Sequence, residues 1–82
     1  MALYLISYDL NKPEKDYPKL IDYLEQIGAH RVLYSEWLVR IDLDRDGLLA
    51  ATRAHVDSND GLMVCPVESA TGINLKYPIS KI

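Results

Sequence analysis

The sequence is poor in cysteine and has no long apolar run. Cys65 is the only cysteine among 82 residues, which excludes an internal disulfide and a metal site of the multi-cysteine kind. No segment approaches the roughly 18 to 20 apolar residues of a membrane-spanning helix, so we predict no membrane partner. Residues 1–10 lack a basic stretch followed by a long apolar run, and we expect a structural strand there, not a signal peptide. A single thiol fits a reducing compartment, so we expect a cytoplasmic protein.

The chain also lacks an excess of positive charge. It has nine Lys and Arg residues against twelve Asp and Glu, which gives a formal net charge of −3. A protein that binds nucleic acid over a broad face usually has the opposite balance. The composition therefore disfavours nonspecific nucleic-acid binding but leaves a local basic patch open. There is also no glycine-rich phosphate loop, Walker motif or CxxC pair.

What the chain does have is enough apolar residues for a core. Hydrophobic residues make up 49% of the sequence, and the length predicts one domain over residues 1–82. A domain this small has a large surface relative to its volume, so association with a second copy is a common source of stability.

The first half of the chain predicts a strand, a helix and a hairpin. Residues 3–8 are apolar at nearly every position, as in a central strand covered at least partly on both faces. A helix follows, because apolar residues recur at three- and four-residue spacing: Tyr17, Leu20, Ile21, Leu24 and Ile27. Asp16 can cap this helix, and Gly28 ends it. Strands over 31–34 and 37–42 then form a hairpin around Ser35-Glu36.

The second half predicts one more helix and one more strand. Asp44 or Asp46 can cap the helix. Its buried stripe comprises Leu48, Leu49, Thr52 and Val56. The strand covers residues 62–67, and Pro66, which lacks an amide donor, places it at a sheet edge or near its own end.

This βαββαβ order predicts an α+β, ferredoxin-like domain with an antiparallel sheet of strand order 4-1-3-2. Strand one is central in that order and strand four is an edge. The apolar character of residues 3–8 and the position of Pro66 agree with these two assignments independently.

The C-terminal residues 72–82 predict a fifth strand. Four apolar residues alternate with polar ones after Thr71-Gly72: Ile73, Leu75, Tyr77 and Ile79. Near a sheet edge in so small a domain, such a strand commonly pairs with a second copy, and we expect a two-fold homodimer. The alternative is a tail that folds back on its own sheet.

Asp9 is the candidate catalytic residue and metal ligand. In the predicted topology the end of the first strand lies beside the hairpin, so Asp9, Ser35 and Glu36 are expected near one another, with Asn11 and Asp60 at the same rim. Oxygen ligands at a sheet rim suit Mg²⁺ or Mn²⁺, which could activate water against a phosphodiester. The alternative interpretation of Asp9 is a turn-forming residue that accepts hydrogen bonds from nearby backbone amides.

The sequence offers several other residues with reactive or charged side chains. Lys12 and Lys15 are possible phosphate contacts beside Asp9, or the solvated start of a helix. His30 and His55 are expected at the surface or boundary, because no metal-ligand spacing includes them. Cys65 is expected to be a small buried hydrophobe, and most of the aromatic residues are expected in the core or at the dimer seam.

Two segments of the sequence resemble a known family. The segments Leu5-Ile6-Ser7-Tyr8-Asp9-Leu10 and Arg31-Val32-Leu33-Tyr34-Ser35-Glu36-Trp37, joined by a helix that closes with Ile27-Gly28-Ala29, resemble the CRISPR-associated Cas-two proteins and their VapD-like relatives. The likeness covers about the first half of the chain, and the second half is similar only in the order of its elements.

The resemblance implies a ferredoxin-like homodimer whose C-terminal strand crosses to the partner. It further implies that Asp9 lies near the two-fold axis and binds a divalent metal for endonuclease activity, with Ser35, which matches a family serine, as a possible neighbour. Asn11 is a second possible neighbour, because the predicted topology places it at the same rim. In the family's spacer-acquisition complex the protein is instead a non-catalytic scaffold that holds DNA. The acidity of this chain and the lack of a second clear catalytic residue motivate a second hypothesis, a non-catalytic dimeric adaptor that binds nucleic acid or a protein partner. The acidic residues around the first helix favour a stand-alone relative over a DNA scaffold.

Overall fold

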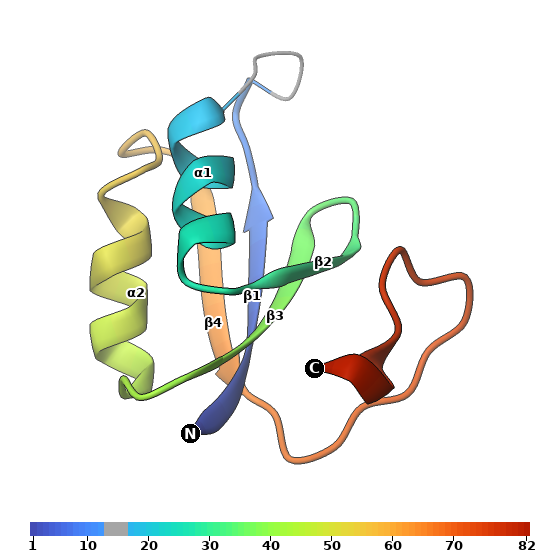
Figure 1. The fold of residues 1–82 in the computed structure, drawn as a ribbon. Helices are drawn as coiled ribbons and strands as arrows, with labels where there is room; N and C mark the ends of the chain where they lie inside the picture. Colours follow the sequence, from blue (N-terminus) through green and yellow to red (C-terminus); the bar gives the residue numbers. More distant parts are fainter. Residues whose placement is uncertain (13–16) are drawn as a thin grey trace.

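A computed structural model describes residues 1–12 and 17–82 and contains one antiparallel sheet with two helices on one face (Figure 1). The elements are β1 (Ala2–Asp9), α1 (Pro18–Gln26), β2 (His30–Leu33), β3 (Glu36–Ile41), α2 (Arg45–Arg53), β4 (Gly61–Pro66) and the short 3₁₀ turn η1 (Ile79–Lys81). The strand order is β2-β3-β1-β4, which confirms the predicted 4-1-3-2 order, and β1 is central.

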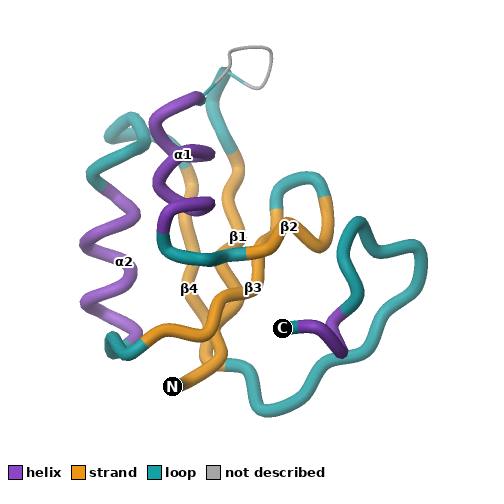
Figure 2. The backbone as a smooth tube through the Cα atoms, in the orientation of Figure 1, coloured by secondary structure: helices purple, strands orange, loops and turns teal. Residues whose placement is uncertain are grey.

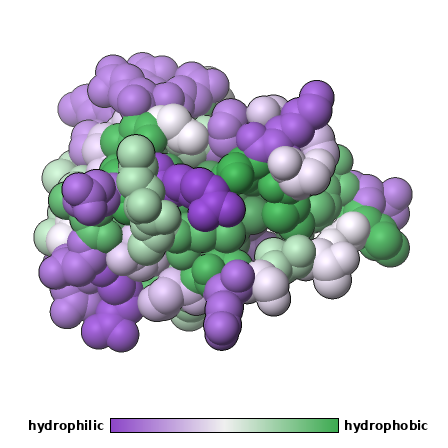
Figure 3. All heavy atoms as spheres, turned by 60° about the horizontal axis from the view of Figure 1, so that its bottom comes forward, coloured by the Kyte–Doolittle hydropathy of each residue, from purple (hydrophilic) through white to green (hydrophobic). Residues whose placement is uncertain are grey.

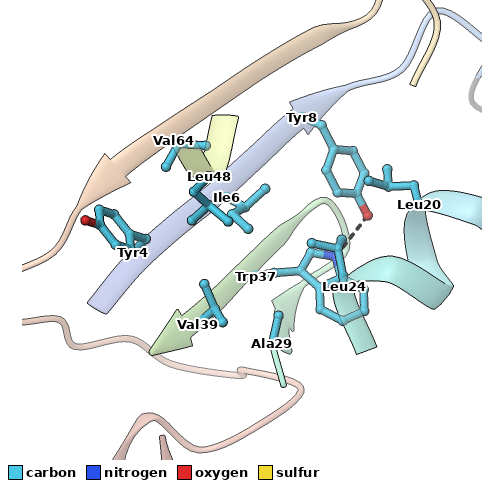
Figure 4. Close-up of a cluster of buried hydrophobic side chains, with 10 residues drawn as sticks. All are labelled: Tyr4, Ile6, Tyr8, Leu20, Leu24, Ala29, Trp37, Val39, Leu48 and Val64. Carbon is cyan, nitrogen blue, oxygen red and sulfur yellow. Dashed lines mark hydrogen bonds between the residues drawn. The ribbon is translucent and has the colours of Figure 1, made fainter. Parts of the chain in front are cut away.

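Strand β1 organises the core because it pairs with β3 on one side and β4 on the other. Alternate residues of β1 point to opposite faces of the sheet. Tyr4, Ile6 and Tyr8 face the helices and are buried, whereas Leu3 and Leu5 are half-buried on the other face. The rest of the buried cluster comes from both helices, from β3 and β4, and from the residue that precedes β2: Leu20, Leu24, Ala29, Trp37, Val39, Leu48 and Val64 (Figure 4).

One polar contact lies inside this core. The indole Nε1 of Trp37 donates a hydrogen bond of 3.0 Å to Tyr8 Oη, and the bond is buried (Figure 4). A buried indole N–H without an acceptor would cost about 1–3 kcal/mol. The bond therefore favours the observed pairing of β1 with β3 over a shifted one.

The helix ends follow local sequence signals. Pro18 is the first residue of α1, where no amide donor is needed. Gly28 has φ +81°, and the amides of Gly28 and Ala29 donate to the carbonyls of Glu25 and Leu24, which is a Schellman ending. The predicted cap Asp16 lies outside the described residues. Asp44 caps α2, since its Oδ1 accepts from the Gly47 amide at 2.6 Å.

Each of the three later strands begins one residue before its predicted start. Strand β2 begins at His30, the residue after Ala29, whose amide donates the last hydrogen bond of the Schellman motif. Strand β4 begins at Gly61, because Gly61 pairs with Asp9 at the end of β1. Pro66 is the last residue of this edge strand, as predicted, and one further bond joins the Val67 amide to the Leu3 carbonyl.

Neither α1 nor α2 covers the second face of the sheet, which we call the open face. The residues that point to it alternate with the core residues of β1, β3 and β4: Leu3, Leu5, Ser7, Asp9, Glu36, Leu38, Arg40, Gly61, Met63 and Cys65. Leu38 is buried, whereas Met63 is 54% exposed. The open face is thus apolar at its centre but only partly covered by the chain itself.

The tail after β4 follows the β2 edge without forming a strand (Figure 2). The Lys76 amide donates to the Val32 carbonyl at 2.9 Å, and the Tyr77 ring stacks on His30 with centroids 4.1 Å apart. Asn74 has φ 56°, which interrupts an extended backbone. In the single chain the tail therefore folds back on its own sheet, and its pairing with a second copy stays a prediction.

Replacing Asp44 by alanine should destabilise the fold by about 1 kcal/mol, because the first turn of α2 loses its side-chain acceptor. Asp46, the other predicted cap, is exposed and pairs with Arg45, so Asp46→Ala should cost only a few tenths of a kcal/mol. Urea unfolding of the two variants measures the difference. A larger loss for Asp46→Ala would contradict the assignment of the cap.

Candidate functional site

The end of β1 meets the β2–β3 hairpin, as the sequence predicted. The Tyr8 amide donates to the Ser35 carbonyl at 3.1 Å, so the hairpin turn lies beside the last residues of β1. Asp9 ends the strand and is exposed. The structure thus brings Asp9, Ser35 and Glu36 to one end of the sheet.

Two carboxylates share the open face at this end. Ser7 pairs with Glu36 across β1 and β3, and Ser7 Oγ donates to Glu36 Oε2 at 3.2 Å. Asp9 follows Ser7 by two residues and points to the same face. On the β4 side Asp9 pairs with Gly61, where an added Cβ would lie 3.4 Å from the Asp9 Cβ. Gly61 therefore leaves the β4 flank of Asp9 without a side chain.

Asp60 and Asn11 also meet, but their contact holds two loops together. Asp60 Oδ1 accepts from the Asn11 amide at 2.7 Å and from Tyr17 Oη at 3.4 Å, and Oδ2 accepts from the Asp57 amide at 2.8 Å. Burial raises the pKa of Asp60, but these hydrogen bonds outweigh it and the net pKa lies below its ordinary value of 3.8. Both oxygens of Asp60 accept hydrogen bonds from the surrounding loops, so its carboxylate holds the loop after β1 against the loop before β4.

The remaining predicted residues lie outside this arrangement. Lys12 is exposed in the loop after β1, and its charge helps to lower the pKa of Asp60. Lys15 lies outside the described residues. His55 is half-buried against Tyr23, as His30 is against Tyr77, which agrees with their predicted boundary positions.

Cys65 is half-buried on the open face, opposite Leu5. The sequence predicted a small buried hydrophobe at this position. The structure gives Cys65 an apolar neighbour in β1 but leaves its side of the sheet only partly covered.

The sequence did not single out Arg31, which has an unusual environment. Its guanidinium carbon lies 4.8 Å from the Trp37 ring centroid and 5.8 Å from that of Tyr34. Its Nη2 donates to Tyr8 Oη at 3.3 Å. The signal that could have found this cluster is an arginine followed by aromatic residues three and six positions later, on either side of a hairpin turn.

Within residues 1–12 and 17–82, no three His, Cys, Asp or Glu side chains are grouped closely enough to hold a metal ion. No family model matches the chain. None of the described helices has the length and apolar character needed to cross a membrane.

The Asp60 contacts predict a pH dependence of stability. The pKa of Asp60 is lower in the folded chain than in the unfolded chain, so its contribution is present above about pH 3.8 and is lost as the pH falls through the lower, folded-state pKa. Asp60→Asn should lower the urea midpoint at neutral pH, and the difference from wild type should shrink in acid. Asp57→Asn is the matched control, because the Asp57 contact uses its backbone amide. An equal effect of both substitutions at all pH values would contradict this assignment.

Proposed function

We propose that the chain is a metal-dependent endoribonuclease that acts as a homodimer, with Asp9 of each copy as a metal ligand and catalytic residue. The observation that carries the proposal is the position of Asp9 and Glu36 on the open face at one end of the sheet, next to Ser7. The βαββαβ order and the central β1 support the ferredoxin-like arrangement that the resemblance to Cas-two and VapD-like proteins implies.

The donor atoms suit Mg²⁺ or Mn²⁺ in kind, because both ions prefer carboxylate oxygens. Their number in one chain is too small, since no group of three ligand side chains occurs in the described part of the molecule. A second copy related by a two-fold axis would supply another Asp9 and another Glu36. The proposed metal site therefore requires the dimer.

Three features of the described chain support a second copy. Its accessible surface is 5492 Å², compared with roughly 5,000 Å² expected for a compact chain of this mass. The open face exposes Met63, and the tail exposes 82% of Ile73. Figure 3, in which the lower end of Figure 1 is turned forward, shows apolar side chains near the middle of the view with polar ones around them. The outer edge of β4 is also unpaired in the described sheet.

In the proposed site each residue has a separate task. The metal, when bound, would activate water and stabilise the charge that develops on the phosphodiester. Ser7 holds the Glu36 carboxylate through its hydroxyl. Asp9 is free of a β4 side chain because Gly61 is its partner. Lys12 and Lys15 would contact phosphates of the RNA, and Ser35 and Asn11 would lie beside the site.

A non-catalytic dimeric adaptor that binds nucleic acid or a protein partner is the second candidate. One observation favours it: the described residues of a single chain hold no complete set of metal ligands. The acidic net charge of −3 adds to this, because it limits nucleic-acid contacts to local patches.

Replacing Asp9 by alanine should lower the rate of RNA cleavage at least about 100-fold, which corresponds to about 2.7 kcal/mol of transition-state stabilisation. The measurement uses purified protein, labelled RNA and Mn²⁺ or Mg²⁺. Asp42→Ala is the matched control, since Asp42 is exposed and follows β3 at the opposite end of the sheet. Equal cleavage by wild type and Asp9→Ala would refute the nuclease, and no cleavage by wild type would leave the adaptor.

Deletion of residues 72–82 should convert the dimer to a monomer or an aggregate, measured by light scattering. Ile73→Asp tests the same contact with a single residue. In the lone chain Ile73 is 82% exposed, so the substitution should cost the monomer little, whereas a dimer that buries Ile73 should dissociate. Ser80→Asp adds the same charge at another exposed position of the tail and should not change the mass per particle. A tail-deleted chain with unchanged mass per particle would show that the tail does not hold the dimer.

A further inference from the structure

The hairpin places an arginine among aromatic rings at the end of the sheet that carries Asp9. The Arg31 guanidinium lies within cation–π distance of Trp37 and Tyr34. Its Nη2 is also fixed by a hydrogen bond to Tyr8 Oη, the same oxygen that accepts from the buried Trp37 indole. The guanidinium is therefore held in one orientation before any ligand arrives.

The donors of Arg31 are mostly unused within the described chain. Its Nε is buried and has no hydrogen-bond partner there, and Nη2 makes only the long contact to Tyr8 Oη. The one ion pair among the described side chains joins Arg45 to Asp46, so no described carboxylate neutralises Arg31. The buried Nε cannot reach a ligand from outside, so an anion with several oxygens, such as a phosphate, would meet the terminal Nη donors of this positioned guanidinium.

Tyr34 adds a flat apolar surface next to this charge. The residue is 69% exposed at the hairpin turn, although its ring is large and apolar. An exposed aromatic ring beside an arginine is the combination that binds single-stranded nucleic acid, because a base stacks on the ring and its phosphate meets the cation. A duplex offers no free base face to such a ring.

We propose that Arg31 and Tyr34 form a binding site for one nucleotide of a single-stranded RNA or DNA segment, with the base on Tyr34 and a phosphate at Arg31. The inference rests on the proposed function in one respect: the bound nucleotide would belong to the strand that the nuclease cleaves. Arg31 pairs with Trp37 on the face that the helices cover, whereas Asp9 points to the open face, so the strand would pass around this end of the sheet between the two sites. The two residues and Asp9 belong to the same end of the sheet, because the carbonyl of Ser35, next to Tyr34, accepts from the Tyr8 amide. A local contact of this kind is compatible with a net charge of −3.

The test is binding without catalysis. Fluorescence anisotropy in EDTA would follow a labelled single strand of about 12 nucleotides, a length within the usual range of site sizes. Tyr34→Ala should weaken binding about tenfold or more, because one stacked base is lost. Tyr34→Phe keeps the ring and should bind as wild type does. Arg31→Gln should weaken binding and make the slope of log K against log salt shallower by about 0.7, the share of one phosphate contact with a single strand.

Arg45→Ala is the matched charge control, because Arg45 is exposed, begins α2 and belongs to the opposite end of the sheet. It should leave binding nearly unchanged. The site is refuted if wild type does not bind the single strand at low salt, or if a duplex of the same length binds more tightly. It is also refuted if Tyr34→Ala binds as tightly as wild type. The same holds if Arg45→Ala weakens binding as much as Arg31→Gln does. A melting curve of Arg31→Gln shows whether this variant is folded. Tyr34→Ala tests the site independently, because Tyr34 is mainly exposed and its loss should not disturb the fold.

The same experiment separates this inference from the nuclease. Asp9→Ala should still bind the single strand in EDTA, because Asp9 contributes no contact to the base or phosphate at the hairpin. Binding without metal-dependent cleavage would leave the nucleotide site standing and remove the nuclease. If Tyr34→Ala cleaves and binds RNA as wild type does, the nucleotide site is refuted and the nuclease proposal stands.

Discussion

The pairing of β1 with two neighbours is the constraint on which the rest of the structure depends. Its register with β3 and β4 sends Tyr4, Ile6 and Tyr8 toward the helices, and sends Ser7 and Asp9 to the open face. A register shift of one residue would exchange these two sets of side chains and would bury the Asp9 carboxylate in the apolar core. The hydrogen bond from Trp37 Nε1 to Tyr8 Oη helps to hold the observed register.

That register connects core and surface through a single side chain. Tyr8 packs its ring in the core, while its hydroxyl accepts from both Trp37 and Arg31. The core thereby fixes the orientation of a partly exposed arginine, at the end of the sheet where Asp9 and the hairpin meet. The two sites we propose, a metal site on the open face and a nucleotide site at the hairpin, therefore depend on the same few residues of β1.

Most of the fold could be predicted from local patterns. The apolar run of β1, the helix ending at Gly28 and the edge position of Pro66 each follow from a short segment and its physical preferences. The tail could not be predicted in this way. Its alternation from Ile73 to Ile79 is that of a strand, but a strand exists only where another strand pairs with it, and the single chain provides one backbone bond, from Lys76 to Val32.

The sequence by itself determined the element order, the residues of the core and the nearness of Asp9 to the hairpin, because these depend on periodicity and on a small number of allowed topologies. Only the tertiary structure decided the roles of the polar residues. It engaged both oxygens of Asp60 in holding two loops together, paired Glu36 with Ser7 and surrounded Arg31 with aromatic rings. The long-range hydrogen bonds of Asp60, Glu36 and Arg31 join residues 23 to 49 positions apart, and their partners are set by packing and not by spacing.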